Sequence, residues 1–268
     1  MRLALASLDQ NWLDKEANFA RCTELARMAA GQGCDLVVFP EMTLTGYSLD
    51  MLTLAEPTDG ALTLQWFQEL AHDAAVDIIF GACLLDSVTG KPQNTLCLAR
   101  RQGGVAVLYS KIHPFSFAGE DKVLQSGSKL GLTSVANLRL GCSICYDLRF
   151  PELFSAMAPH CDAVVNIANW PARRVAHWRA LLVARAIENQ MFMFGVNRTG
   201  VDGNNLQYEK SSMAVAPDGV VLVPTITADE MDIYDIEPTE TVRYRAEFPT
   251  VRDKRYSLYS KLFGDNAC

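Results

Sequence analysis

The chain has 268 residues, of which 49% are hydrophobic and 21% are charged, an ordinary globular composition for one large domain or two small ones. A net charge of -7 argues against a dedicated nucleic-acid-binding surface. No stretch approaches the ~20 apolar residues that a membrane span needs, and the apolar run at the start is too short for a signal segment. We therefore expect a soluble, cytoplasmic protein that binds neither nucleic acid nor a membrane.

The first third of the chain alternates between strand-like and helix-like patterns. Its predicted elements are a strand over 2–8, a helix over 14–33, a strand over 34–41, a helix over 61–76 and a strand over 76–85. Gly31 and Gly33 favour the end of the first helix, and Pro40 closes the second strand. This order is typical of a sheet covered by helices.

The middle of the chain predicts paired strands, and helices then return. The predicted elements are strand pairs within 94–111 and 131–145, a helix over 151–158, a strand over 162–169, a helix over 177–190, a strand over 191–196, a polar loop over 199–210, two strands about 217–219 and a last strand over 230–238. Two separate strand-helix-strand runs indicate two mixed sheets, each with helices on its outer face. No low-complexity linker divides the chain, so we predict a single domain over 1–268 with a C-terminal tail from about residue 237.

Eight cysteines are present, and in a cytosolic chain of this size they read as small buried hydrophobes. Cys142 and Cys145 have the spacing of a redox or zinc pair, but no second pair completes such a site and the four histidines are scattered. Along a strand, side chains three residues apart point to opposite faces. We therefore expect no metal, with Cys142 as strand packing and Cys145 as a residue at a strand end.

Three predicted strands end in a reactive side chain, namely Glu41, Lys111 and Cys145. Ligand sites in helix-covered sheets collect beyond the strand ends. A neighbouring ammonium favours the thiolate of a cysteine, a carboxylate can take the thiol proton, and a lysine can stabilise an oxyanion. These three residues would therefore suffice for acyl transfer without a metal.

Two other interpretations of these residues stay open at this level. Glu41 and Lys111 are also explained as solvated charges at loop edges, with Cys145 in the core. Alternatively, His113, two residues after Lys111, would form a Cys-His pair with Cys145.

Three blocks of sequence carry a resemblance that favours the catalytic interpretation. "FPEMTLTGYS", "YSKIHPF" and "CYDLRFPEL" resemble, in order and separation, the signature blocks of the nitrilase superfamily of carbon-nitrogen hydrolases. The resemblance spans nearly the whole chain. It implies an α/β fold, a four-layer αββα sandwich with mixed sheets, which usually pairs into homodimers or larger homo-oligomers.

The same resemblance implies a role for each matching residue. Glu41 takes the place of the general base, Lys111 that of the oxyanion-stabilising lysine, and Cys145 that of the nucleophile. Glu120 matches a second glutamate that orients the substrate and the lysine, and the backbone N–H of Tyr146 would share the oxyanion. The implied chemistry releases ammonia through a cysteine thioester and needs no cofactor.

The stretch after the strand at 162–169 bears on the substrate. "NWPARRVAHWRALLVARAIENQ" and "VNRTGVDGNNLQY" resemble bacterial omega-amidases, which hydrolyse 2-oxoglutaramate and 2-oxosuccinamate. Trp170 is expected to wall the pocket. Arg173 and Arg174 could bind a substrate carboxylate through two hydrogen bonds, although surface or subunit contacts would also explain them.

Other functions remain in view from the sequence. The alternatives within the superfamily are an amidase for deaminated glutathione, another aliphatic amidase and a nitrilase. A non-catalytic interaction subunit is the alternative from another class.

Overall fold

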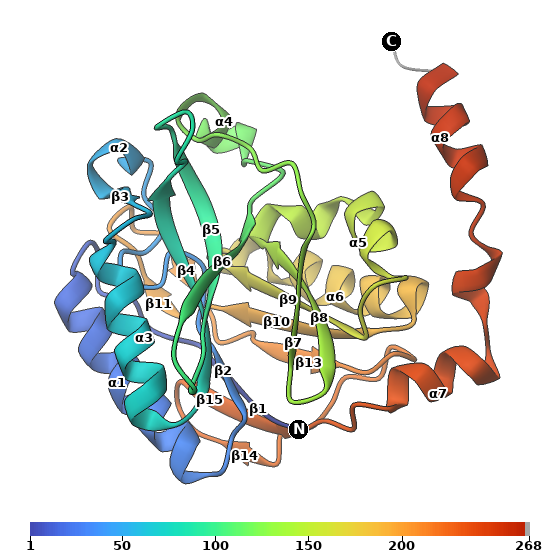
Figure 1. Ribbon diagram of the computed structural model, residues 1–268, viewed down its shortest axis with the longest axis horizontal. Helices are drawn as coiled ribbons and strands as arrows, with labels where there is room; N and C mark the ends of the chain where they lie inside the picture. The colour runs from blue at the N-terminus through green and yellow to red at the C-terminus, as the bar shows by residue number, and fades with distance from the viewer. Residues whose placement is uncertain (266–268) are drawn as a thin grey trace.

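The computed structural model describes residues 1–265, which form two stacked β-sheets with helices on both outer faces (Figure 1). The larger sheet has eight strands, in the order β14 (Ile226–Thr227), β15 (Met231–Asp235), β1 (Arg2–Ala6), β2 (Leu36–Val38), β4 (Asp77–Leu85), β5 (Pro92–Ala99) and β6 (Val105–Ser110), with β3 (Glu56–Pro57) paired to β4. The smaller sheet has five, in the order β13 (Met213–Val215), β10 (Phe192–Asn197), β9 (Ala163–Ala168), β8 (Leu138–Ile144) and β7 (Gly131–Val135).

Helices cover the outer face of each sheet and produce four layers. The helices α1 (Lys15–Gly31) and α3 (Leu62–Ala74) pack on the larger sheet, and α5 (Pro151–Met157) and α6 (Val175–Asn189) pack on the smaller one (Figure 1). Two single-turn helices, α2 (Met51–Leu54) and α4 (Glu120–Val123), lie in connections. The arrangement confirms the predicted αββα sandwich with mixed sheets.

The alternation of side chains along β1 shows why the layers form. Leu3 and Leu5 belong to the core shared with the smaller sheet, whereas Ala4 and Ala6 belong to the core beneath α1 and α3. Successive side chains of a strand point to opposite faces, so the unbroken apolar run over residues 3–6 is buried on both sides. Six of the seven described cysteines are likewise buried, as predicted, and Cys268 lies outside the described residues.

Three details differ from the sequence prediction. The second strand expected after the turn at 217–219 is reduced to a single bridge between Val215 and Val221. Val220, Val221 and Val223 are exposed, and only Leu222 of this segment packs against the core. The polar loop over 199–210 contains a short hairpin of β11 (Gly200–Val201) and β12 (Gln207–Tyr208). The predicted tail contains the helices α7 (Glu240–Glu247) and α8 (Tyr256–Asp265), and α8 projects from the body (Figure 1).

Within residues 1–265, no helix has both the length and the apolar composition that crossing a bilayer requires.

A glycine in β4 allows the turn after β2 to approach very closely. A Cβ atom at Gly81 would lie 2.5 Å from the backbone nitrogen of Met42 and 3.0 Å from the Cα of Glu41. Met42 itself adopts a left-handed conformation, with φ of 48°. Thr43 fixes the approach, because its hydroxyl accepts a hydrogen bond from the Gly81 N–H at 2.9 Å. The position of Glu41 therefore depends on the missing side chain at residue 81.

Gly81→Ala should lower the free energy of unfolding by about 1–3 kcal/mol, because the added methyl group overlaps backbone that cannot move freely. Gly31→Ala is the matched control, since nothing lies within 4 Å of a Cβ there. Urea unfolding of both variants measures the effect, and an equal stability of the two would contradict the close approach.

Candidate active site

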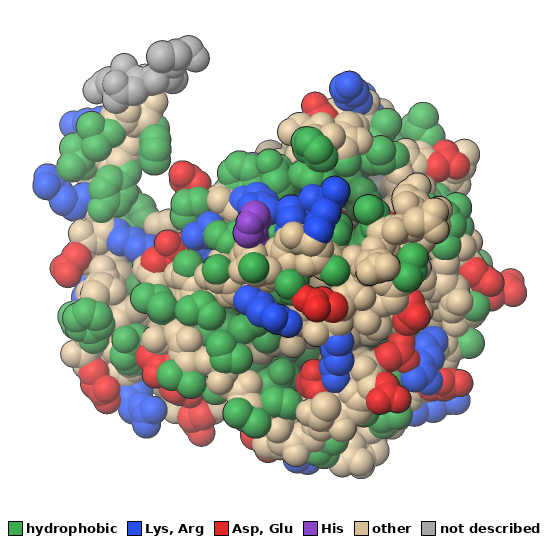
Figure 2. Space-filling model, turned by 180° about the vertical axis from the view of Figure 1, so that it is seen from behind, with side chains coloured by type: hydrophobic (Ala, Val, Ile, Leu, Met, Phe, Trp, Pro, Cys, Tyr) green, Lys and Arg blue, Asp and Glu red, His purple; other side chains and the backbone are tan. Residues whose placement is uncertain are grey.

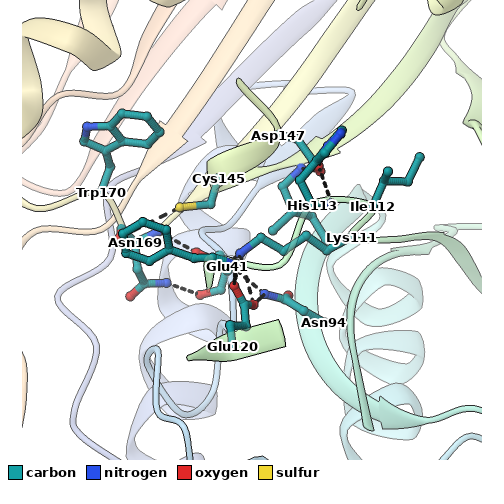
Figure 3. A network of polar contacts seen from close by, with 12 residues as sticks. Glu41, Asn94, Lys111, Ile112, His113, Glu120, Cys145, Asp147, Asn169 and Trp170 are labelled. Atoms are coloured by element: carbon teal, nitrogen blue, oxygen red, sulfur yellow. Dashed lines mark hydrogen bonds and ion pairs between the residues drawn. The ribbon is translucent and has the colours of Figure 1, made fainter. Parts of the chain in front are cut away.

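A buried ammonium lies between two buried carboxylates at one edge of the sandwich. The Nζ atom of Lys111 is 3.0 Å from Oε1 of Glu41 and 2.9 Å from Oε2 of Glu120 (Figure 3). Lys111 is 2% exposed and both glutamates are 0% exposed. Because the three charges are out of water, each depends on the others for its compensation.

The direction of the strands brings the sequence-predicted residues to this edge. Glu41 follows β2, Lys111 directly follows β6, and Cys145 directly follows β8. The strands β2 and β4 are parallel, and β6 regains the direction of β4 through two antiparallel pairings. The carboxyl ends of β2 and β6 therefore share one edge of the larger sheet, and β8 ends opposite them in the smaller sheet (Figure 3).

Two asparagines hold the carboxylate of Glu41, a role that the sequence analysis assigned to neither. Asn94 Nδ2 donates to Glu41 Oε1 at 2.7 Å, and the backbone N–H of Asn169 donates to Oε2 at 2.9 Å. Asn169 Nδ2 also donates to the backbone oxygen of Glu41 at 2.6 Å. Asn94 lies near the start of β5, an antiparallel neighbour of β6, so its place beside the end of β6 could have been inferred from strand order.

Cys145 occupies a tight turn between β8 and the 3₁₀ helix of Cys145–Arg149. Its φ of 47° lies in the left-handed region, which is unusual for a residue with a side chain and is found at functional sites. The sulfur is half-buried and lies 4.0 Å from the backbone oxygen of Asn169. The turn therefore presents the thiol beyond the end of the strand, beside Glu41, whereas Cys142 packs in the core.

The electrostatics of the site favour a neutral thiol and a charged lysine. Burial, and after it the Glu41 carboxylate, raise the pKa of Cys145 well above its ordinary value, and Lys111 only partly offsets them. Burial lowers the pKa of Lys111, but Glu120 and Glu41 outweigh it, so this pKa lies well above its ordinary value. The arrangement is suited to a thiol that loses its proton to a base during the reaction.

A pocket of about 150 Å³ opens above the thiol. Cys145 and Lys111 line its base, and the aromatic rings in its wall are those of Tyr47, Phe115, Phe117, Tyr146, Trp170 and Tyr208. The structure places the predicted pocket residue Trp170 in this wall, where it is 3% exposed. Glu120 lies beneath the pocket and contacts Lys111 instead of lining it.

Three arginines line the same pocket. Arg173 and Arg174 come from the 3₁₀ helix after Trp170, and Arg149 comes from the helical turn that begins at Cys145. Arg149 stacks over Trp170 at 4.8 Å, and Arg174 lies over Phe115 at 5.6 Å. In residues 1–265 none of these three guanidiniums forms an ion pair with a carboxylate.

The charge of this arginine cluster, Arg149, Arg173 and Arg174, is uncompensated by the chain itself. Burial, followed by the charges of Arg173 and Arg149, lowers the pKa of Arg174 below its ordinary value. Within the chain, His177 Nδ1 lies 3.3 Å from Arg149 Nη2. Figure 2 shows a group of Lys and Arg side chains on the rear face of the molecule. Arg149 was missed from the sequence because its block, "CYDLRFPEL", was interpreted through Cys145, the predicted nucleophile. A pocket that gathers unpaired guanidiniums is suited to an anionic ligand.

The alternative Cys-His pair is not formed. His113 Nδ1 lies 2.8 Å from Asp147 Oδ1 (Figure 3), and its ring stacks on Phe150. His113 therefore contacts Asp147 and takes no part in the contacts of Cys145.

Comparison with known proteins identifies the family. The model of the carbon-nitrogen hydrolase family matches residues 2–246. The chain belongs to the carbon-nitrogen hydrolase family. It is a hydrolase that acts on carbon-nitrogen bonds other than peptide bonds, and the predicted nitrilase-type fold is confirmed.

Two relatives and one solved structure show how close the similarity is. The chain is 30% identical to the omega-amidase YafV of Escherichia coli K12 over 94% of this chain and 96% of the relative. It is 32% identical to a 2-oxoglutaramate amidase of Bacillus subtilis over 84% and 86%. The structure of XC1258 from Xanthomonas campestris, a superfamily protein with an arsenic adduct in its active site, superposes with a TM-score of 0.86 at 31% identity and covers 95% of this chain and 97% of that one.

Cys145 should remain a thiol up to at least pH 9.0, the ordinary cysteine value, because its pKa is raised in the folded protein. The ultraviolet absorbance of the thiolate, taken as wild type minus Cys145→Ala, measures its titration separately from the other seven cysteines. Since the raised pKa favours the protonated folded state, Cys145 should also lose its contribution to stability as the pH rises above that value. A thiolate signal that is complete at neutral pH would contradict this assignment.

Proposed function

We propose that the protein hydrolyses the terminal amide of a small carboxylate-bearing substrate, of the 2-oxoglutaramate or 2-oxosuccinamate type, to an acid and ammonia. The observation that carries the proposal is the meeting of a nucleophile, a base and a lysine with three unpaired arginines at one small pocket. The relatives named omega-amidase and 2-oxoglutaramate amidase support the same substrate class.

The first half-reaction forms a thioester on Cys145. Glu41 takes the thiol proton as the sulfur attacks the amide carbon, and the developing oxyanion is held by Lys111 and the backbone N–H of Tyr146. Glu41 then gives the proton to the amide nitrogen, the carbon-nitrogen bond breaks, and ammonia leaves. The raised pKa of Cys145 supports this order, because the proton stays on sulfur until attack.

The second half-reaction releases the acid. A water molecule enters where ammonia left, Glu41 takes one of its protons, and the hydroxide equivalent attacks the thioester carbon. The carbon-sulfur bond then breaks and the proton returns to Cys145. Glu120 takes no proton in this scheme, because its two oxygens bind Lys111 and hold the ammonium in place.

Arg174 is the arginine that we assign to the substrate carboxylate. It is half-buried over Phe115, whereas Arg173 is exposed. Its backbone oxygen also accepts a hydrogen bond from Trp170 Nε1 at 2.8 Å, which fixes the turn. A carboxylate bound there would neutralise the repulsion among the three guanidiniums.

The size of the pocket favours a small substrate over deaminated glutathione. Its volume of about 150 Å³ is below the roughly 300–1,000 Å³ of pockets that hold drug-sized ligands. Assembly into homodimers or larger homo-oligomers and a cytoplasmic location stay predictions.

Cys145→Ala should abolish ammonia release from 2-oxoglutaramate, and Glu41→Gln should reduce kcat by at least about 100-fold, because both half-reactions need the base. Ammonia release and circular dichroism of each variant provide the measurement. A folded Cys145→Ala protein with normal turnover would refute the thioester route.

Arg174→Met should raise KM for 2-oxoglutaramate by about 10- to 100-fold, the effect of losing a hydrogen-bonded charge pair of about 1.5–3 kcal/mol. Turnover of neutral amides such as butyramide should stay within about twofold, because they have no carboxylate to lose. Arg179→Met is the control, since Arg179 lies on α6 outside this pocket and faces Glu209 at 3.9 Å. Good turnover of another amide by the wild type, with none of the oxo-amide, would overturn the substrate.

A further inference from the structure

A buried carboxylate that takes no part in the proposed chemistry lies next to the site. Asp147 is 0% exposed and is absent from the wall of the pocket. Its Oδ2 accepts hydrogen bonds from the Tyr109 hydroxyl at 2.8 Å and from the Ile144 N–H at 2.9 Å. Its Oδ1 accepts from the backbone N–H of His113 at 3.0 Å and lies 2.8 Å from His113 Nδ1. Four donors therefore converge on one carboxylate, and Figure 3 shows Asp147 beside His113.

These donors belong to the two strand ends that carry the chemistry. Tyr109 and His113 flank Lys111 at the end of β6 in the larger sheet, and Ile144 directly precedes Cys145 at the end of β8 in the smaller sheet. The Tyr109 hydroxyl also accepts a hydrogen bond from the N–H of Ile112, at 3.2 Å. Asp147 thus joins the lysine-bearing and cysteine-bearing segments directly.

The two sheets need such a connection because apolar packing between them is not directional. The side chain of Lys111 is flexible, and its ammonium donates hydrogen bonds to Glu41 and Glu120. Cys145 is held in a left-handed conformation that only its surroundings can maintain. In the described residues, no hydrogen bond links Lys111 to Cys145. Their separation must therefore be fixed by groups around them.

We propose that Asp147, with Tyr109 and His113, is a positioning residue that sets the separation between the Cys145 sulfur and the Lys111 ammonium. The inference rests on the proposed function, in which both groups act on one carbonyl. It assigns to Asp147 no proton transfer and no contact with the substrate. His113 serves as a donor whose ring orientation is fixed by Phe150, with which it stacks at 3.8 Å.

The test compares Asp147→Asn with Asp162→Asn. Asp162 is a buried carboxylate of the same sheet that accepts hydrogen bonds from Arg139 Nε at 2.8 Å and Nη2 at 2.6 Å. It precedes β9 and therefore lies at the end of the sheet opposite Cys145. Each change removes one buried negative charge and weakens the hydrogen bonds of that carboxylate, but only Asp147 lies next to Cys145 and Lys111.

Asp147→Asn should lower kcat by about 10- to 100-fold with KM within about threefold, because a small misplacement of reacting groups costs rate more than binding. An asparagine at 147 cannot accept from all four donors, since its Nδ2 is itself a donor. Asp162→Asn should keep kcat within about twofold, even if it lowers the midpoint of thermal unfolding as much as Asp147→Asn does. Equal losses of kcat in the two variants would overturn the positioning role.

Two further variants separate positioning from general structure. His113→Ala removes the side-chain donor and should lower kcat, and His113→Asn should restore much of it because the amide nitrogen can donate in place of Nδ1. If Asp147→Asn does not fold, Tyr109→Phe, which keeps the carboxylate and removes one donor, should lower kcat at unchanged KM. Failure of His113→Asn to recover kcat, or an unchanged kcat in Tyr109→Phe, would contradict the proposal.

Labelling with iodoacetamide checks that the pocket survives. Asp147→Asn should still be alkylated at Cys145, as shown by peptide mass spectrometry, and loss of that labelling would mean that Asp147 maintains the whole pocket instead of one separation. The kcat and KM of each variant are compared with those of the wild type, using the amide that the wild type hydrolyses best. An error in the substrate class therefore leaves this test intact, whereas an inactive wild type with every amide refutes the proposed function itself.

Discussion

Lys111 carries a positive charge where almost no solvent reaches it, and two carboxylates hold it there. Removing one partner from a buried ion pair costs about 3–5 kcal/mol, because the remaining charge is left uncompensated. Loss of any one of Glu41, Glu120 and Lys111 would therefore leave a buried charge uncompensated. The amide of Asn94 also donates to both glutamates. This requirement fixes the ends of β2, β5 and β6 relative to one another before any substrate arrives.

The thiol is set against that charged group from the opposite sheet. Cys145 reaches it because β8 ends in a left-handed turn, and Asn169, which follows β9, binds Glu41 from the same sheet. Both sheets thus contribute to one site, and the packing between them determines the distances within the proposed active site. A four-layer sandwich is suited to this, because helices shield both outer faces while the strand ends remain open.

The pocket brings together two different groups of charged side chains. Lys111 lines the base with Glu41 and Glu120 packed against it from beneath, and the arginine cluster lines the wall. A substrate with an amide at one end and a carboxylate at the other would match both regions at once. Trp170 and Phe115 carry the guanidiniums on their faces, which orients these groups without an acidic partner that would compete with the substrate.

The sequence alone determined the layers and the three reactive strand ends. Alternation in β1 and helical spacing in α1 arise from local periodicity, and Glu41, Lys111 and Cys145 stand within motif blocks that read linearly. Only the tertiary structure decided the partners of these residues. Asn169, Arg149 and Asp147 stand within quoted sequence blocks and Asn94 does not, yet nothing in the linear sequence shows which groups they contact. Their contacts arise because parallel and antiparallel pairings bring distant strand ends to one edge. Hydrogen bonds across 53 and 128 residues leave no periodic trace in a sequence, since their geometry exists only after the sheets have packed.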